Sequence, residues 1–304
     1  MRFHLLQAFR AFILLSFAVL LFKLHFSGDI TKFINPKYEG LSQAASILFL
    51  ILFIIQITRI WTVKENIVHH HCHHDDHDHN CSHDHGDSPF NTKKLISYVV
   101  IVFPLITGFL LPAKVLDASI ANKKGGLTVL TNQKQQTTPE TNEAQEPTIK
   151  KNLIDQSRVS NPKVLSQGEY DQLTKELEQS STVVMNDDVF STYYDEIQMN
   201  LSKYKGKEIE IKGFVYKEEG LEQDQLVIAR FLITHCVADA GIIGFISKLP
   251  EASTIEVNTW IEADGFLETT TFNGTEIPII KINNWKKIKE PKDPYVYPIS
   301  IRIL

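Results

Sequence analysis

Apolar residues gather in three long runs within residues 1–113, and the chain is more polar after them. The runs cover residues 5–26, 41–58 and 95–113. A helix needs about 20 mostly apolar residues to cross a hydrocarbon core of about 30 Å. The first run reaches that length if Arg10 and Lys23 extend their charged ends to the membrane interfaces. The pattern therefore predicts an α-helical membrane part with about three transmembrane (TM) helices.

Two other interpretations of these runs are weaker. The first run resembles a signal peptide, but no good small-x-small cleavage site precedes Gly28, which favours a retained helix. Three buried core helices would be accompanied by amphipathic sequence, and little of it lies between the runs.

Basic residues near the ends of the runs predict how the helices are oriented, because cytoplasmic loops are enriched in Lys and Arg. The N-terminus and the second loop carry more of them than the first loop and the segment after the third run. Close to the runs, the first group is Arg2, Arg10, Arg59, Lys64, Lys93 and Lys94, and the second is Lys23, Lys32, Lys37 and Lys114. Lys123 and Lys124 follow a little further from the third run. We expect a multi-pass protein in contact with membrane lipid, with its C-terminal domain extracytoplasmic.

Residues 114–180 are expected to form a flexible polar linker. Within them, residues 131–150 are rich in Thr, Gln, Glu and Asn and contain no aromatic residue, so they cannot bury a core. A short helix is expected at residues 166–179.

Residues 181–290 have the pattern of a small folded domain. Apolar residues recur at helical spacing over residues 189–204, after Asp187 or Asp188 as a helix cap. Five strand-like runs separated by turn residues follow, at residues 208–216, 226–234, 241–248, 259–269 and 277–288. This pattern predicts an all-β, OB-like small barrel with a preceding helix, followed by a C-terminal tail at residues 291–304.

Composition narrows the function classes. The formal net charge is −5, and from residue 181 onward 13 Lys and Arg stand against 19 Asp and Glu. A nucleic-acid partner usually requires a basic surface, so none is expected. The chain has three cysteines, and two of them lie in one histidine-rich stretch, which makes a disulfide framework improbable.

That stretch, residues 69–85, is the strongest chemical signal. Fifteen of its 17 residues are His, Cys or Asp, and it holds nine of the chain's 12 histidines. Imidazole and thiolate suit Zn2+ and other borderline or soft divalent metal ions. Such a tract can assemble several exchangeable ligand sets, and binding should weaken as pH falls through about 6.5, the ordinary histidine pKa. The candidate ligands are His69, His70, His71, Cys72, His73, His74, His77, His79, Cys81, His83 and His85. The alternative is a solvated polar loop.

A second candidate site lies in the soluble domain. His235, Cys236 and Asp239 follow a predicted strand at a turn and offer N, S and O ligands to one metal ion or another ligand. His235 and Cys236 are adjacent, so they converge only if the chain bends there. Two alternatives to a metal or ligand site remain. Cys236 is either a redox thiol or a buried residue at a turn that Asp239 caps. Trp260, Trp285, Glu262 and Asp264 are most simply barrel positions.

The whole chain resembles the YcgQ family of bacterial membrane proteins. The matching stretches are LHFSGDITKFINPKYEGLS at 24–42, the histidine loop, VVIVFPLITGFLLPAKVLDASIANKKG at 99–125, and FLITHCVADAGIIGF at 231–245. In the family pattern a Cys commonly stands where His235 stands. A His–Cys pair still suits a soft metal, whereas a dithiol role does not carry over. The resemblance implies a bacterial cell-membrane protein that partners a multi-pass membrane permease and is associated with zinc handling.

We therefore expect an accessory subunit of a permease complex, without enzymatic activity, that binds zinc through its histidine loop. The chain contains no phosphate loop, Ser-His-Asp motif or metalloprotease helix signature. A cell-envelope scaffold or ligand-binding module without a metal role is the main alternative, and a thiol-dependent enzyme using Cys236 is another.

Overall fold

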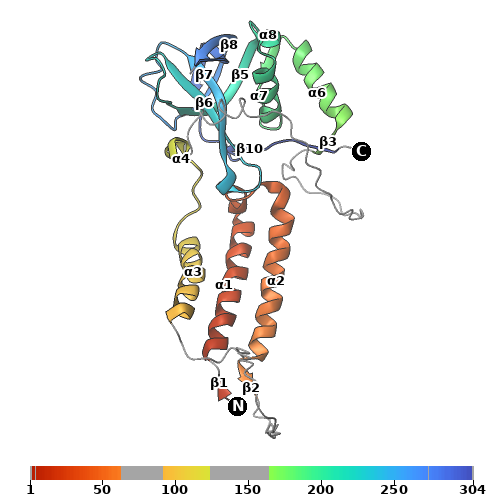
Figure 1. The fold of residues 1–304 in the computed structure, drawn as a ribbon, viewed down its shortest axis with the longest axis vertical. Helices are drawn as coiled ribbons and strands as arrows, with labels where there is room; N and C mark the ends of the chain where they lie inside the picture. Colours follow the sequence, from red (N-terminus) through yellow and green to blue (C-terminus); the bar gives the residue numbers. More distant parts are fainter. Residues whose placement is uncertain (1, 4, 63–91, 124–163, 273, 303–304) are drawn as a thin grey trace, which may run out of the picture. The chain divides into compact units, whose positions relative to one another are not determined.

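The computed structural model describes residues 2–3, 5–62, 92–123, 164–272 and 274–302. The histidine loop and most of the predicted linker lie outside the described residues. The chain divides into two compact units. Figure 1 shows helices in one of them and mainly strands in the other. The helical unit contains Met1–Ile30 and Tyr38–Lys114, and the sheet unit contains Thr31–Lys37 and Val115–Leu304.

Three helices lie where the apolar runs predict them. α1 (Leu5–Ser27) packs along α2 (Glu39–Thr58), and α3 (Thr92–Leu110) contacts α1. Polar side chains join them, since the Gln56 amide donates to the Gln7 side chain and the Arg10 guanidinium donates to the Tyr98 hydroxyl over 3.2 Å. The elements from the N-terminus are β1 (Arg2–Phe3), α1 (Leu5–Ser27), η1 (Asp29–Lys32), η2 (Pro36–Tyr38), α2 (Glu39–Thr58), β2 (Trp61–Thr62) and α3 (Thr92–Leu110).

Two of these helices are long and apolar enough to cross a membrane, at Gln7–Ser27 and Pro36–Thr58. α2 buries none of its residues and exposes large apolar side chains such as Leu41 and Ile47. Such a surface is costly in water and suits lipid or another membrane helix. The apolar part of α3, Ile96–Leu110, is shorter, so two helices rather than three meet the length requirement within the described residues. These features make the chain membrane-associated.

The second unit is mostly β-sheet. All five predicted strands are present, with ends within three residues of the predicted ones. They are β5 (Glu208–Tyr216), β6 (Gln225–Leu232), β7 (Gly241–Lys248), β8 (Trp260–Phe272) and β9 (Thr275–Lys287). The short strands β4 (Thr182–Val184) and β10 (Tyr295–Val296) extend the sheet to the order β10-β6-β7-β9-β8-β5-β4.

Strand β5 pairs on both sides. It is antiparallel to β8 from Glu208 to Phe214, and its last three residues are antiparallel to β6. β7 is parallel to β9, while the β6–β7 and β8–β9 pairs are antiparallel. Alternating burial along β5 places Ile209 and Ile211 in the core and leaves Glu208, Glu210 and Lys212 in solvent.

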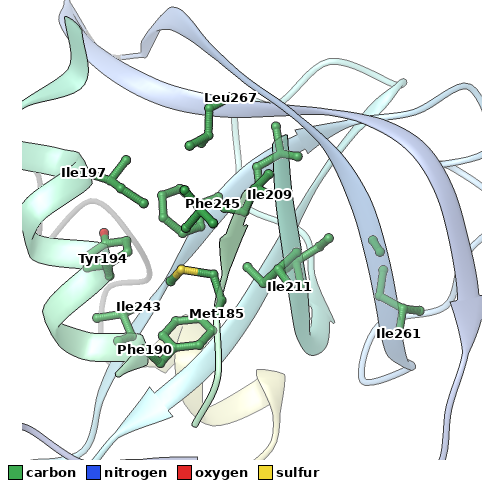
Figure 2. Packing of buried hydrophobic residues seen from close by; sticks show 14 of the residues in the cluster. Met185, Phe190, Tyr194, Ile197, Ile209, Ile211, Ile243, Phe245, Ile261 and Leu267 are labelled. Carbon is green, nitrogen blue, oxygen red and sulfur yellow. The ribbon is translucent and has the colours of Figure 1, made fainter. Parts of the chain in front are cut away.

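Helix α7 (Phe190–Met199) covers one side of this sheet. Its residues Phe190, Tyr194 and Ile197 recur at helical spacing and pack against the strands, as Figure 2 shows for Phe245 and Ile211. The short helix α8 (Leu201–Tyr204) follows, so the predicted helix at residues 189–204 is divided in two.

A second apolar cluster is rich in aromatic rings. Phe214 stacks on Phe231 at 5.1 Å and meets Trp260 edge-on at 5.9 Å. Ala118 and Ala121 of α4 (Ala118–Lys123) are buried in this cluster, and the Ala118 N–H donates to the Asn258 side chain. The start of the predicted linker is therefore part of the sheet unit's core.

The predicted linker and tail contribute further elements. Ser166 caps α6 (Gln167–Gln179) by a reciprocal capping box with Glu169, which agrees with the expected helix at residues 166–179. β3 (Val164–Ser166) pairs in parallel with β11 (Ser300–Arg302), and β10 pairs with β6. The described part of the 291–304 range is thus folded into the unit.

Arg230 on β6 is the buried charge that joins these parts. Its guanidinium donates to the carbonyl oxygens of Asp293, Pro294 and Tyr295, and it forms an ion pair with Asp187. Burial lowers the pKa of Arg230, and the Asp187 carboxylate opposes that shift. The guanidinium also lies over the Trp260 ring at 5.3 Å.

The expected capping role of Asp187 and Asp188 is wrong. The N-cap of α7 is Val189, and no side chain caps it. Asp187 is instead directed to Arg230, because a buried guanidinium without a counter-charge is costlier than an uncapped helix end.

We predict that changing Arg230→Met destabilises the full-length protein in detergent by about 3–5 kcal/mol, because buried carbonyl oxygens and a carboxylate lose their donors. Asp187→Asn should cost less, about 1–3 kcal/mol, since the Asp187 side chain is 52% exposed and that of Arg230 only 1%. Denaturant unfolding followed by tryptophan fluorescence measures both changes. The neighbouring exposed residue provides the control, because Asp188→Asn should change stability by less than about 0.5 kcal/mol. Equal losses for all three variants would contradict this role of Arg230.

Candidate functional site

The predicted motif of His235, Cys236 and Asp239 lies in the connection between β6 and β7. β6 ends at Leu232, the short 3-10 helix η3 covers Val237–Asp239, and β7 begins at Gly241. Cys236 is the N-cap of η3. We call residues 233–239 the β6–β7 turn.

Asp239 organises the turn through one carboxylate. It accepts hydrogen bonds from the backbone N–H of His235 at 2.8 Å and of Cys236 at 3.3 Å. Partial burial raises the pKa of Asp239, but the hydrogen bonds from the His235 ring and from the two backbone N–H groups lower it by more. The net pKa is below the ordinary aspartate value, so the carboxylate stays ionised at neutral pH.

His235 and Asp239 form a directed pair. His235 Nδ1 lies 2.8 Å from an Asp239 carboxylate oxygen. An ionised carboxylate is an acceptor only, so Nδ1 carries the proton and donates. In the neutral ring Nε2 is then the acceptor nitrogen, which is the tautomer that ligates a metal ion or takes up a proton.

Cys236 takes part in the turn through hydrogen bonds with Asp239. Its carbonyl oxygen accepts a hydrogen bond from the Asp239 backbone N–H at 3.0 Å, and its own backbone N–H donates to the Asp239 carboxylate at 3.3 Å, which closes the start of η3. The thiol is partly buried and forms no disulfide within the described residues. The alternative of a capped turn, considered from the sequence, therefore describes the local geometry of Cys236.

The turn does not bring its three candidate side chains together as a metal-ligand set. Across residues 2–62, 92–123 and 164–302, as far as they are described, no group of three or more His, Cys, Asp or Glu side chains is arranged to hold a metal ion. The Asp239 carboxylate contacts His235 and backbone amides, in the manner of a group that orients a ligand. The ligands proposed in the histidine loop lie outside the described residues.

The sequence analysis missed a residue that builds this turn. Asn35, in the loop between α1 and α2, is 2% exposed and donates its side-chain amide to the carbonyl oxygens of Ile233 and Thr234. Its backbone N–H donates to the His235 carbonyl at 2.9 Å. The Asn-Pro pair at 35–36 signals a turn, but nothing local in the sequence reveals a partner about 200 residues away.

A separate hollow of about 420 Å³ lies over β5, β8 and β9. Glu210 and Asp264 line it as directly opposed cross-strand partners, and the Asn284 amide donates to Asp264 at 3.0 Å. Like charges in such a pair are unfavourable for folding. At the neighbouring cross-strand position the charges are opposite, because Glu262 forms ion pairs with both Lys212 and Lys286. Trp285, treated as a barrel position in the sequence analysis, also lines the hollow.

Comparison with family models covers both units. The DUF1980 N-terminal domain matches residues 9–127, and the DUF1980 C-terminal domain matches residues 161–298.

Two relatives match along most of their length. The UPF0703 protein YcgQ of Bacillus subtilis is 32% identical over 296 residues, which covers 95% of this chain and 99% of the relative. A Streptococcus mutans protein named as a two-component membrane permease complex subunit is 25% identical over 278 residues, covering 91% of this chain and 94% of that protein. With two matched domains and this degree of identity, the chain belongs to the YcgQ (UPF0703) family of DUF1980 proteins.

Proposed function

We propose that this protein is a non-enzymatic accessory subunit of a membrane permease complex. The observation that carries the proposal is the similarity over nine-tenths of the chain to a relative named as a subunit of a two-component permease complex. The apolar surfaces of α1 and α2 support it, because they offer membrane-embedded faces to another helix bundle.

The few helices favour an accessory role over transport by this chain alone. Ionisable residues within membrane helices are rare, and where they occur they usually mark the path of a transported ion or substrate. In the described part of α2, the residues between Glu39 and Arg59 carry no charge. The transport path is therefore assigned to a multi-pass partner.

We propose that the sheet of the second unit is an OB-like barrel. Consecutive pairings run from β5 through β6, β7, β9 and β8 and return to β5, as in a closed or nearly closed sheet. Two glycines support tight curvature at β6. A Cβ on Gly213 or on Gly244 would collide with the backbone of Ile228 or Ala229.

The sheet unit is proposed to be extracytoplasmic in a protein with three transmembrane helices. Residues 31–37 join α1 to α2 and also belong to the sheet unit. If both helices cross the membrane, the sheet unit lies on the side of that loop, and α3 returns the chain to the same side. The histidine loop then lies on the cytoplasmic side, in agreement with the distribution of basic residues.

Divalent metal handling, most simply of zinc, is the proposed task of the histidine loop. Its ligand types support zinc over hard cations such as Mg2+. The β6–β7 turn is the second candidate metal site. There His235, in the tautomer set by Asp239, is the first candidate ligand, and Cys236 is the next.

We predict that the full-length chain, purified from native membranes in mild detergent, retains a multi-pass membrane protein in near-stoichiometric amount. Mass spectrometry and gel filtration of the complex provide the measurement. A variant with Ile47→Lys and Ile54→Lys on the exposed face of α2 should lose that partner while remaining inserted, and Lys289→Ala, an exposed change in the sheet unit, should retain it. A chain that elutes alone in every preparation refutes the permease assignment.

We predict that zinc content follows the histidine loop. The full-length protein should bind zinc, and a form without residues 69–85 should lose most of it, as measured by elemental analysis and competition with a chromophoric chelator. Binding should weaken between about pH 7 and 5.5, because protons compete for imidazole. If zinc persists without the loop and is lost on changing His235→Ala, the β6–β7 turn is the metal site. Zinc absent from every form would favour the ligand-binding alternative, with the hollow at Glu210 and Asp264 as its first candidate site.

The three native cysteines test the proposed topology. In intact cells, a membrane-impermeant maleimide should label Cys236 in a C72S/C81S background, because the sheet unit is exposed outside. A C236S chain, which keeps Cys72 and Cys81, should be labelled after permeabilisation and not before it. The reverse pattern would place the sheet unit in the cytoplasm and contradict the proposal.

A further inference from the structure

The loop between α1 and α2 is attached to the sheet unit by one antiparallel β-bridge, which lies between the short 3-10 helices η1 and η2. We call Thr31–Lys37 the interhelix strap. It forms an antiparallel bridge in which Ile34 faces Cys236. Its Lys37 side chain also donates to the Ser300 hydroxyl at 3.1 Å.

The hydrogen bonds on either side define the geometry of this bridge. The Asn35 N–H donates to the His235 carbonyl, and the Val237 N–H donates to the Phe33 carbonyl, both at 2.9 Å. Ile34 and Cys236 are therefore a non-hydrogen-bonded pair. In such pairs the Cα atoms are about 4.5 Å apart and the side chains project from the same face.

The Asn35 side chain completes the attachment. It is buried, and its amide group donates to the Ile233 carbonyl at 3.2 Å and to the Thr234 carbonyl at 3.0 Å. Its oxygen accepts from the Lys37 N–H at 2.9 Å. These contacts satisfy backbone groups of the β6–β7 turn, which would otherwise lose their partners at a partly buried position.

We propose that the interhelix strap couples the α1–α2 hairpin to the β6–β7 turn. The turn holds His235 and Asp239 in their observed geometry while the strap is seated, and unseating the strap opens the turn and exposes Cys236. This coupling does not depend on metal binding. In a permease complex, which rests on the proposed function, a partner that moved the hairpin would act on His235 and Cys236 by this route.

An engineered disulfide tests whether the strap is seated. In the full-length C72S/C81S protein in nanodiscs, Ile34→Cys should form a disulfide with Cys236 under mild oxidation, because the paired Cα atoms lie within the range that a disulfide requires. Loss of maleimide labelling and peptide mass spectrometry report the bond. Lys37→Cys is the control, since it lies in the same strap but faces Ser300 and should stay reduced. Equal cross-linking of the two variants would overturn the seated strap.

Thiol reactivity tests the coupling itself. In the same background, Asn35→Ala should raise the alkylation rate of Cys236 by at least about tenfold, because the turn loses two hydrogen bonds from the strap. Asn35→Ser, with a shorter donor, should give an intermediate rate, and it remains informative if Asn35→Ala fails to fold. Asn284→Ala, which removes an exposed amide on β9, should leave the rate unchanged. A rate unaffected by both Asn35 changes, in protein that forms the Ile34→Cys cross-link, would show a static attachment and refute the coupling.

Discussion

The buried guanidinium of Arg230 is the constraint on which the sheet unit depends. A charge removed from water must be surrounded by acceptors, and here these come from Asp187 before helix α7 and from carbonyl groups of residues 293–295. One side chain on β6 thereby determines where the start of the helix and the C-terminal segment lie. The aromatic residues around it, Trp260 and Phe190, face the same group. Regions that look independent along the chain become parts of one core for this electrostatic reason.

The backbone polar groups of the β6–β7 turn also have hydrogen-bond partners. Its amides are satisfied from within by Asp239, and its carbonyls are satisfied from outside by Asn35. The turn is therefore neither a simple loop nor a preformed three-ligand site. It holds His235 and Asp239 as a hydrogen-bonded pair next to the partly buried thiol of Cys236. The proposed second ligand or metal site rests on that pair, and the histidine loop is proposed to hold a separate set of ligands.

The two structural units together bear on the proposed role of this YcgQ-family protein. The helical unit has apolar faces that suit lipid or partner helices, and the sheet unit incorporates the loop that connects two of its helices. The proposed coupling of the sheet unit to the α1–α2 hairpin rests on this shared loop. This arrangement fits an accessory subunit better than a domain attached through a linker alone.

Patterns between residues close in sequence were sufficient for much of the fold. Apolar runs predicted α1 and α2, strand-like runs separated by turn residues predicted β5 to β9, and the short helix expected at residues 166–179 is α6. The residue types of the turn also identified His235, Cys236 and Asp239 as a candidate site. These features depend on backbone periodicity and on contacts within a few residues, which a sequence displays directly.

Contacts between distant residues were decided by the tertiary structure. Asp187 was expected to cap a helix and instead pairs with Arg230, and Ala118 was expected in a linker and lies in the core. Asn35 carried no local signal for its contact with Ile233 and Thr234. In each case a buried group, namely Arg230, Ala118 or Asn35, has partners that lie far from it in the sequence. Those partners are chosen by three-dimensional packing, and the local pattern of the chain does not encode them.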